Sequence, residues 1–154
     1  MTRISIASDF NMIVQWDILF YKDLMLSHIM DEATRFCAVT ILPNKEMVSI
    51  ISGLMSSWCR IFGPPKVILA DGEAGLDSEG AAQWLGRISS QIKTKPPGEH
   101  AQMVERHHEL FRQLMRRFEA QITEEGIEVP LDVLVAECAF ARNALLTVGH
   151  ETPY

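Results

Sequence analysis

Three acidic residues stand where a carboxylate is hard to accommodate. Asp17 interrupts an apolar run between Trp16 and Ile18, and Asp71 directly follows the apolar segment VILA. Glu105 lies near the start of a segment with helical periodicity. A carboxylate in apolar surroundings must be protonated, paired or bound to a metal, because burying it unpaired is strongly unfavourable.

Carboxylates that converge on one point repel each other unless a hard cation neutralises them. Mg²⁺ or Mn²⁺ suits such a site, because these ions bind one or two carboxylates and keep positions for water and phosphate. Two ions about 4 Å apart can activate a water or hydroxyl on one side of a phosphodiester and stabilise the leaving oxygen on the other. The three acids are therefore a candidate site for metal-dependent phosphoryl transfer.

A simpler interpretation of the same residues stays open. Asp71-Gly72 is a common turn pair, since Asp bonds nearby backbone N–H groups. Glu105 is expected in the first turn of its helix, where a carboxylate complements the helix dipole. Asp17, in the middle of a predicted strand, is the hardest of the three to explain in this way.

The hydrophobic pattern predicts the elements that position these acids. Short β-rich apolar runs indicate five strands, and apolar spacings of three and four indicate four helices. The predicted strands cover residues 12–21, 24–30, 34–42, 66–71 and 90–95, and the predicted helices cover 45–62, 76–88, 101–120 and 130–147. The order β-β-β-α-β-α-β-α-α predicts an α/β domain with a mixed five-stranded sheet and helices packed on it.

Turn residues set several predicted boundaries. Asp31-Glu32 is expected in the turn between the second and third strands, and the short connections favour an antiparallel meander. Gly63-Pro64-Pro65 is expected to end the first helix. Pro130 is expected to be the first residue of the last helix.

Composition is that of one soluble globular domain. The 154 residues are 47% hydrophobic and 22% charged. No apolar run approaches the length of a membrane span, and no secretory signal is recognisable, so we expect an intracellular protein with three reduced cysteines. The net charge of −6 arises from residues 119–154, whereas residues 100–118 are locally basic.

The sequence resembles the catalytic cores of retroviral and LTR-retrotransposon integrases, in the DDE transposase and ribonuclease H-like group. The resemblance runs from about Phe10 to Tyr154 and follows the order of the family's motifs. The similar stretches are VQWDILFY, DEATRFCAVTILPNKE, WCRIFGPPKVILADGEAGL, HAQMVERHHELFRQLMRR and ARNALLTVGHETPY.

This resemblance implies a ribonuclease H-like α/β fold with helices on both faces of the sheet, in a catalytic core over residues 12–154 after a linker over 1–11. It implies a DDE-type enzyme that processes DNA 3′ ends and joins them to target DNA. Asp17, Asp71 and Glu105 would be the catalytic residues and the ligands of Mg²⁺ or Mn²⁺, with two ions when DNA is bound.

The resemblance also implies partners and a location. Element-end and target DNA are the expected partners, with a homodimer or higher assembly and neither a membrane nor a small-molecule cofactor. The apolar circumference of helix 45–62 suits a subunit interface. A nuclear or virus-like-particle location would follow for a eukaryotic element.

The resemblance further implies that three basic residues are candidate DNA contacts. Lys95, Arg112 and Arg116 can donate charge-assisted hydrogen bonds to phosphates. The alternative for the two arginines is a solvated helix face on which they pair with Glu109 or Glu119.

The histidines do not have the spacing of a zinc module. His100 is expected in the loop before the helix, where it could approach a scissile phosphate. His107 falls on the apolar stripe and is expected to be a hydrogen-bonded core histidine. His108 lies nearer the Glu105 face, where it could contact DNA or order the glutamate.

Two other functions remain open on the sequence. A related ribonuclease H-like nuclease could use the same acids, for example on the RNA of a hybrid. A core that no longer catalyses could serve as a dimerising or DNA-binding module, which the acidic C-terminal segment would suit.

Overall fold

The computed structural model describes residues 9–70, 79–94 and 99–145, with the side chains of 99–103 left undescribed. Strands and helices follow the predicted order. The strands are β1 (Ile13–Tyr21), β2 (Leu24–Asp31), β3 (Cys37–Leu42), β4 (Val67–Ala70) and β5 (Gln91–Thr94). The helices are α1 (Met47–Leu54), η1 (Met55–Cys59), α2 (Arg60–Phe62), α3 (Glu79–Gly86), α4 (Glu99–Glu125) and α5 (Leu131–Leu145).

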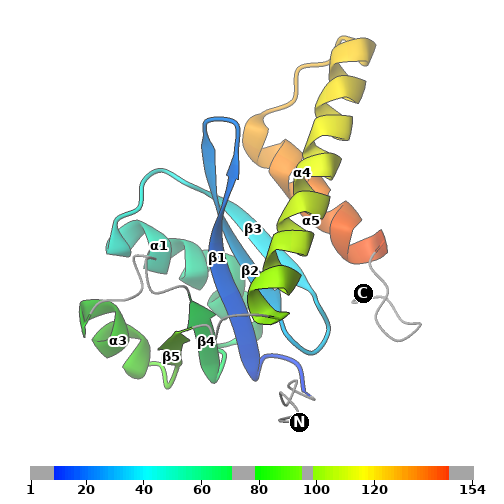
Figure 1. Ribbon diagram of the computed structural model, residues 1–154. Coiled ribbons are helices and arrows are strands. Elements are labelled where there is room, and N and C mark those ends of the chain that lie inside the picture. Colours follow the sequence, from blue (N-terminus) through cyan, green and yellow to red (C-terminus); the bar gives the residue numbers. More distant parts are fainter. Residues whose placement is uncertain (1–8, 71–78, 95–98, 146–154) are drawn as a thin grey trace.

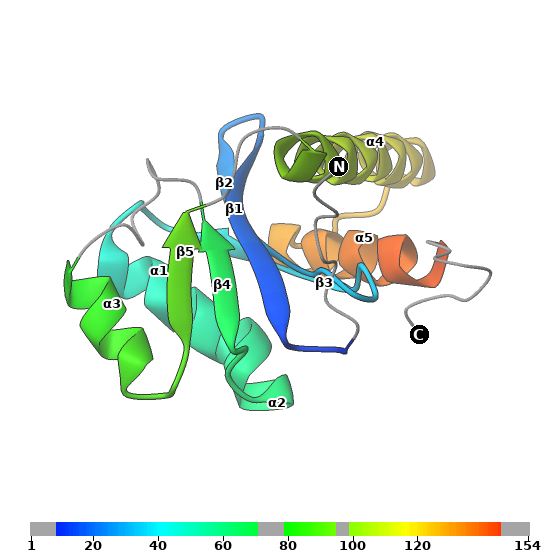
Figure 2. The same ribbon diagram turned by 60° about the horizontal axis from the view of Figure 1, so that its bottom comes forward.

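The five strands form one mixed sheet in the order β3-β2-β1-β4-β5. The first three strands form the expected antiparallel meander, in which Asp17 on β1 lies opposite His28 on β2. β4 and β5 run parallel to β1, as strands joined by helical crossovers do. Figure 1 shows α1 and α3 on one side of this sheet and α4 and α5 on the other, which Figure 2 shows from a second direction.

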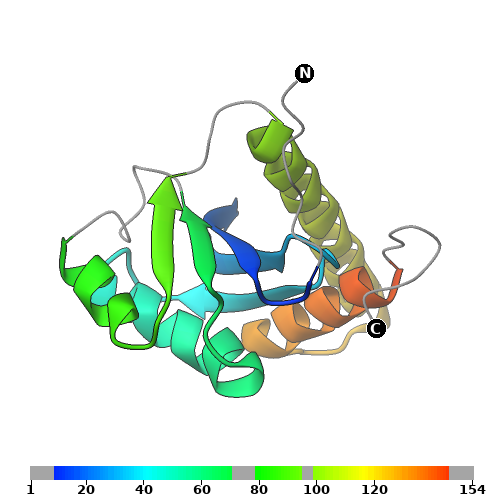
Figure 3. The same ribbon diagram turned by 90° about the horizontal axis from the view of Figure 1, so that it is seen from below.

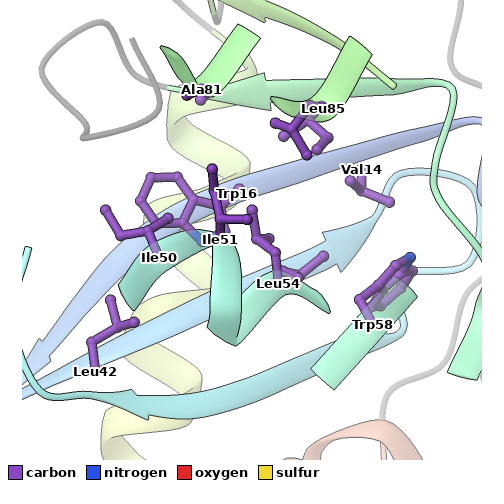
Figure 4. Packing of buried hydrophobic residues seen from close by; sticks show 12 residues of the cluster. Val14, Trp16, Leu42, Ile50, Ile51, Leu54, Trp58, Ala81 and Leu85 are labelled. Carbon is purple, nitrogen blue, oxygen red and sulfur yellow. The ribbon is translucent and has the colours of Figure 1, made fainter. Parts of the chain in front are cut away.

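Each face of the sheet has its own hydrophobic cluster. Under α1, Trp16 of β1 packs with Ile50 and Leu54 of α1, and Figure 4 shows these side chains directed toward one another. On the opposite face, Leu19 of β1 packs with Phe111 of α4. Figure 3 shows α4 and α5 side by side along that second face.

The predicted helix 45–62 is one nearly continuous helical segment with a π-helical stretch inside it, η1. Trp58 of η1 is buried, and its indole N–H donates to Asn11 Oδ1 at 2.7 Å. The segment ends at Gly63, whose φ of 81° suits glycine. The predicted Gly-Pro-Pro stop is therefore confirmed.

Asp31 differs from the expectation that it lies in a turn, whereas Glu32 lies in the turn as predicted. Asp31 is the last residue of β2, and both side chains are buried. The Asp31 carboxylate accepts hydrogen bonds from the backbone N–H and the hydroxyl of Thr34, at 2.8 and 2.9 Å. This side chain builds the turn itself, and β3 consequently begins at Cys37 rather than at residue 34.

The two C-terminal helices also differ in extent from the prediction. α4 starts at Glu99 and continues to Glu125, beyond both predicted ends, before Gly126 adopts a φ of 69°. α5 begins at Leu131, one residue after Pro130, whose carbonyl accepts from the Leu134 N–H at 3.1 Å. In the described part of the chain, no helix combines the length and apolarity that crossing a membrane requires.

Candidate active site

Asp17 lies near the middle of β1 on the face that α4 covers. Successive side chains of a strand point to opposite faces. Trp16 packs under α1 and Leu19 packs under α4, so Asp17 points to the same side as Leu19. The Asp17 side chain is partly buried, and Oδ1 accepts a hydrogen bond from the backbone N–H of Ile18 at 2.8 Å.

Glu105 lies in the second turn of α4, and its side chain is 70% exposed. The expectation that it occupies the first turn is wrong, because the helix already begins at Glu99. Stabilisation of an anion by the helix dipole falls off beyond the first turn. The simpler interpretation of Glu105 as a dipole partner therefore loses its physical basis.

α4 is held against β1 by packing and by a hydrogen bond from Arg112. Arg112 Nε donates to the carbonyl of Phe20 at 3.0 Å. Glu105 precedes Arg112 by two helical turns, roughly 10 Å, and Asp17 precedes Phe20 by three strand residues, again roughly 10 Å. Both elements run in the same general direction (Figure 1), so Glu105 lies toward the level of Asp17 along the strand.

Two buried histidines occupy the space between the strands and α4 at this level. His28 of β2 is the cross-strand partner of Asp17. Its ring makes an edge-to-face contact with the His108 ring on α4, with centroids 4.8 Å apart. His108 Nδ1 lies 4.0 Å from Glu105 Oε1. Both histidines are 1% exposed, so His108 is not available for the direct DNA contact considered from the sequence.

Three further predicted site residues lie outside the part of the chain that the structure describes. They are Asp71, Lys95 and the side chain of His100. β4 pairs with β1 up to Trp16 opposite Ala70, the residue directly before Asp71. In the described ranges, no three His, Cys, Asp or Glu side chains are grouped closely enough to hold a metal ion.

The two candidate phosphate-binding arginines form ion pairs on the outer side of α4. Arg112 Nη1 lies 3.5 Å from Glu109 Oε2, and Arg116 Nη1 donates to Glu109 Oε1 at 3.2 Å. The Arg116 hydrogen bond, together with both positive charges, lowers the pKa of Glu109. Both arginines therefore pair with Glu109, whereas Glu119 pairs with Lys22.

His107 is a core histidine, as its place on the apolar stripe predicted. Nη2 of Arg142, on α5, lies 2.8 Å from His107 Nδ1. Burial, and secondarily the positive charge of Arg142, lowers the pKa of His107 to about 4. The neutral imidazole is therefore the form that accepts a hydrogen bond from the guanidinium.

The importance of Arg142 and Asn143 was not recognised from the sequence. Both are buried, and Arg142 also donates to the carbonyl of Arg35. The Asn143 amide bonds the backbone N–H and C=O of Cys37, each at 2.9 Å. The available signal was Arg142 itself, the single basic residue in an otherwise acidic C-terminal segment.

Similar solved structures are retroviral integrase catalytic cores. The HTLV-2 core, solved with magnesium in a dimeric form, is 18% identical over 94% of both chains, with a TM-score of 0.77. The BIV core is 11% identical over 94% of this chain and 91% of that one, with a TM-score of 0.78. A chain of the simian T-cell lymphotropic virus intasome, solved in complex with PP2A regulatory subunit B56 gamma, is 21% identical with a TM-score of 0.82.

These likenesses establish the fold. The chain covers 94% of the HTLV-2 core. The match to the intasome chain includes 98% of the present chain but only 55% of the intasome chain. A scan of protein-family models and a comparison with curated proteins both find no match. The chain therefore has the ribonuclease H-like fold of integrase catalytic cores, as the sequence resemblance implied.

Proposed function

We propose that residues 12–154, preceded by a linker over 1–11, form the catalytic core of an integrase. This core would be a metal-dependent polynucleotidyl transferase and endonuclease that processes DNA 3′ ends and joins them to target DNA. The observation that carries the proposal is the placement of Asp17 on the sheet face that α4 covers, with Glu105 on that helix, within an integrase-core fold.

Asp71 is proposed as the third acid of this site. Its neighbour Ala70 lies opposite Trp16, in a parallel pairing. If the pairing continues by one residue, Asp71 comes beside Asp17 and faces the same side of the sheet, since side chains alternate along both strands. Asp17, Asp71 and Glu105 would then be catalytic residues and metal ligands.

The donor types fit Mg²⁺ or Mn²⁺. Both ions prefer oxygen ligands, and the described part of the site offers the carboxylates of Asp17 and Glu105. Bound there, two ions would activate a water or a DNA 3′-hydroxyl and stabilise the leaving oxygen. Partial burial of Asp17 limits competition from bulk water, whereas the exposure of Glu105 leaves its carboxylate accessible from the solvent side.

DNA is the proposed partner, and the basic residues of α4 are its proposed contacts. Arg112 and Arg116 would exchange Glu109 for backbone phosphates, which offer the same charge-assisted hydrogen bonds. Lys95 and His100 remain proposed contacts as well. A DNA substrate implies an intracellular location, in the nucleus or in a virus-like particle.

A homodimer is the proposed assembly. The α1 face carries an apolar groove lined by Met47, Val48, Ile51, Ser52, Met55 and Trp84. Val48 is 71% and Trp84 45% exposed, so this groove presents large apolar side chains from two helices to the solvent. The HTLV-2 core, a chain of the same fold, was solved in a dimeric form.

The test is Mn²⁺-dependent reversal of strand transfer on a branched DNA oligonucleotide. The parent protein should yield product, and Asp17→Asn, Asp71→Asn and Glu105→Gln should reduce it at least about a hundredfold, because each removes a charged ligand. Asp23→Asn, in the exposed β1–β2 turn, and Glu124→Gln, exposed near the end of α4, are matched controls for the same chemical changes.

Other results would favour the two alternative functions. DNA binding without product in the parent protein would indicate a non-catalytic dimerising or DNA-binding module. Cleavage of the RNA strand in an RNA–DNA hybrid, without reaction on branched DNA, would indicate a related nuclease. Equal activity in the parent and all three acid variants would refute the proposed site.

A further inference from the structure

The contact between His28 and His108 joins β2, the strand paired with the Asp17 strand, to α4, the helix that carries Glu105. His28 lies on β2 opposite Asp17, and His108 lies one helical turn after Glu105. The two rings meet edge to face at an interplanar angle of 86°, an arrangement that aromatic rings favour. Through these rings, the β1–β2 hairpin is fixed to α4 close to both carboxylates.

The two ends of this connection differ in mobility. Asp17 is held on a central strand, and its carboxylate already bonds the Ile18 N–H. The Glu105 carboxylate is mostly in solvent, where a glutamate side chain has many rotamers available. Nδ1 of the buried His108 ring lies 4.0 Å from that carboxylate, close enough for the ring to influence where the carboxylate lies.

We propose that His28 and His108 act together as positioning residues for Glu105. The edge-to-face contact fixes the orientation of the His108 ring, and the ring directs the Glu105 carboxylate toward Asp17. This inference rests on the proposed function, because it requires that Glu105 be a metal ligand. Residues that orient a ligand in this way commonly change metal affinity or activity by about 10- to 100-fold when replaced.

His107 provides an internal control, because it is the neighbouring residue on the same helix and is also buried. Its ring faces away from this site and contacts Arg142 of α5. Replacing His107 should therefore alter the attachment of α5, whereas replacing His108 should alter the position of Glu105. A general loss of core packing would affect both variants alike.

The experiment measures Mn²⁺ affinity from the EPR signal of free Mn²⁺, with and without the branched DNA oligonucleotide. His108→Phe keeps the ring and its packing but removes both nitrogens, and should bind Mn²⁺ in the DNA complex about tenfold more weakly. His108→Asn offers a polar atom near the place of Nδ1 and should recover most of that affinity. His107→Phe should lower the melting temperature but leave the Mn²⁺ affinity unchanged. If His107→Phe does not fold, His107→Asn is used as the control in its place.

A double-mutant cycle tests whether the two histidines act as one unit. His28→Leu should weaken Mn²⁺ binding in the parent protein but have little further effect on His108→Phe, because the orientation of that ring no longer matters to Glu105. Folded His108→Phe that binds Mn²⁺ like the parent overturns the proposal. So does His108→Asn that binds no better than His108→Phe.

Asp17→Asn and Glu105→Gln separate this inference from the function on which it rests. If both lose Mn²⁺ binding while His108→Phe retains it, the metal site stands and only the positioning role fails. If the parent protein binds no Mn²⁺, or both acid variants bind it like the parent, the proposed function fails and the positioning role fails with it.

Discussion

Burial and a neighbouring guanidinium hold the His107 imidazole in its neutral form. The pKa of His107 is about 4 in the folded protein, against an ordinary value of 6.5. At pH values between these two, the His107 imidazole binds a proton in the unfolded chain but not in the folded chain. The free energy of unfolding must therefore fall as pH drops from 6.5 toward 4, and this contribution changes no further below about pH 4.

As pH falls from 7.5 to 5.5, we expect the His107 contribution to lower the free energy of unfolding by about 1 kcal/mol. A loss of this size follows from the lowered pKa of His107 in the folded protein. Urea unfolding of the parent protein and of His107→Gln, in metal-free buffer at both pH values, measures this contribution as the difference between their pH slopes. Gln keeps an acceptor for Arg142 and does not titrate. Parallel pH profiles of the two proteins would contradict the lowered pKa.

α5 is attached to the sheet through a pairing that imitates a neighbouring strand. β3 is an edge strand, and edge strands expose backbone groups without a strand partner. The Asn143 amide both accepts from the Cys37 N–H and donates to the Cys37 carbonyl, as a backbone peptide would. This pairing covers the exposed backbone at the start of β3 and holds α5 in place beside α4.

Asn143→Ala should lower the free energy of unfolding by about 2 to 3 kcal/mol, because it leaves two buried backbone groups of Cys37 without their partner. Chemical denaturation with urea measures the loss. Asn44→Ala is the control, since the Asn44 side chain accepts an exposed hydrogen bond from the Glu46 N–H and should contribute about 0.5 kcal/mol or less. Similar losses in both variants would show that the strand-like pairing adds nothing.

Periodicity predicted the elements well, because most of them bury one continuous apolar face. The helix over 45–62 and its stop at Gly63 were recognisable from apolar spacing and the Gly-Pro-Pro signal. Local pattern could not show that the Asp31 carboxylate builds its own turn, or that α4 begins at Glu99. These features depend on backbone groups and neighbours that only the folded chain brings together.

The candidate site was predictable as a set of residue types but not as an arrangement. Asp17 was identifiable because a carboxylate in the middle of an apolar strand is difficult to explain otherwise. The different roles of His107 and His108 were predicted from their places on the helix, but the ring partners, Arg142 for His107 and His28 for His108, were not. The direction of each ring depends on how α4 lies against β1 and α5, which is a property of tertiary packing.

At the scale of the whole molecule, the two faces of the sheet carry different kinds of surface. The α4 face carries both described acids and the arginines, whereas the α1 face carries the exposed apolar groove with Val48. A dimer formed through α1 would therefore leave the proposed active site of each copy open to DNA. With the sheet between the two faces, the proposed catalysis and the proposed assembly should be separable by mutation.

Val48→Glu tests that separation. A charge in an apolar interface is strongly unfavourable when it is buried without a partner, so we expect this variant to be monomeric in light scattering after size-exclusion chromatography. Because Val48 is already exposed in the single chain, the melting temperature should change by no more than about 2 °C. Ile127→Glu places the same charge at another exposed apolar residue, after α4, and should keep the parent's mass. A Val48→Glu protein with the parent's dimeric mass would exclude α1 as the interface, and a monomeric parent would exclude the dimer itself.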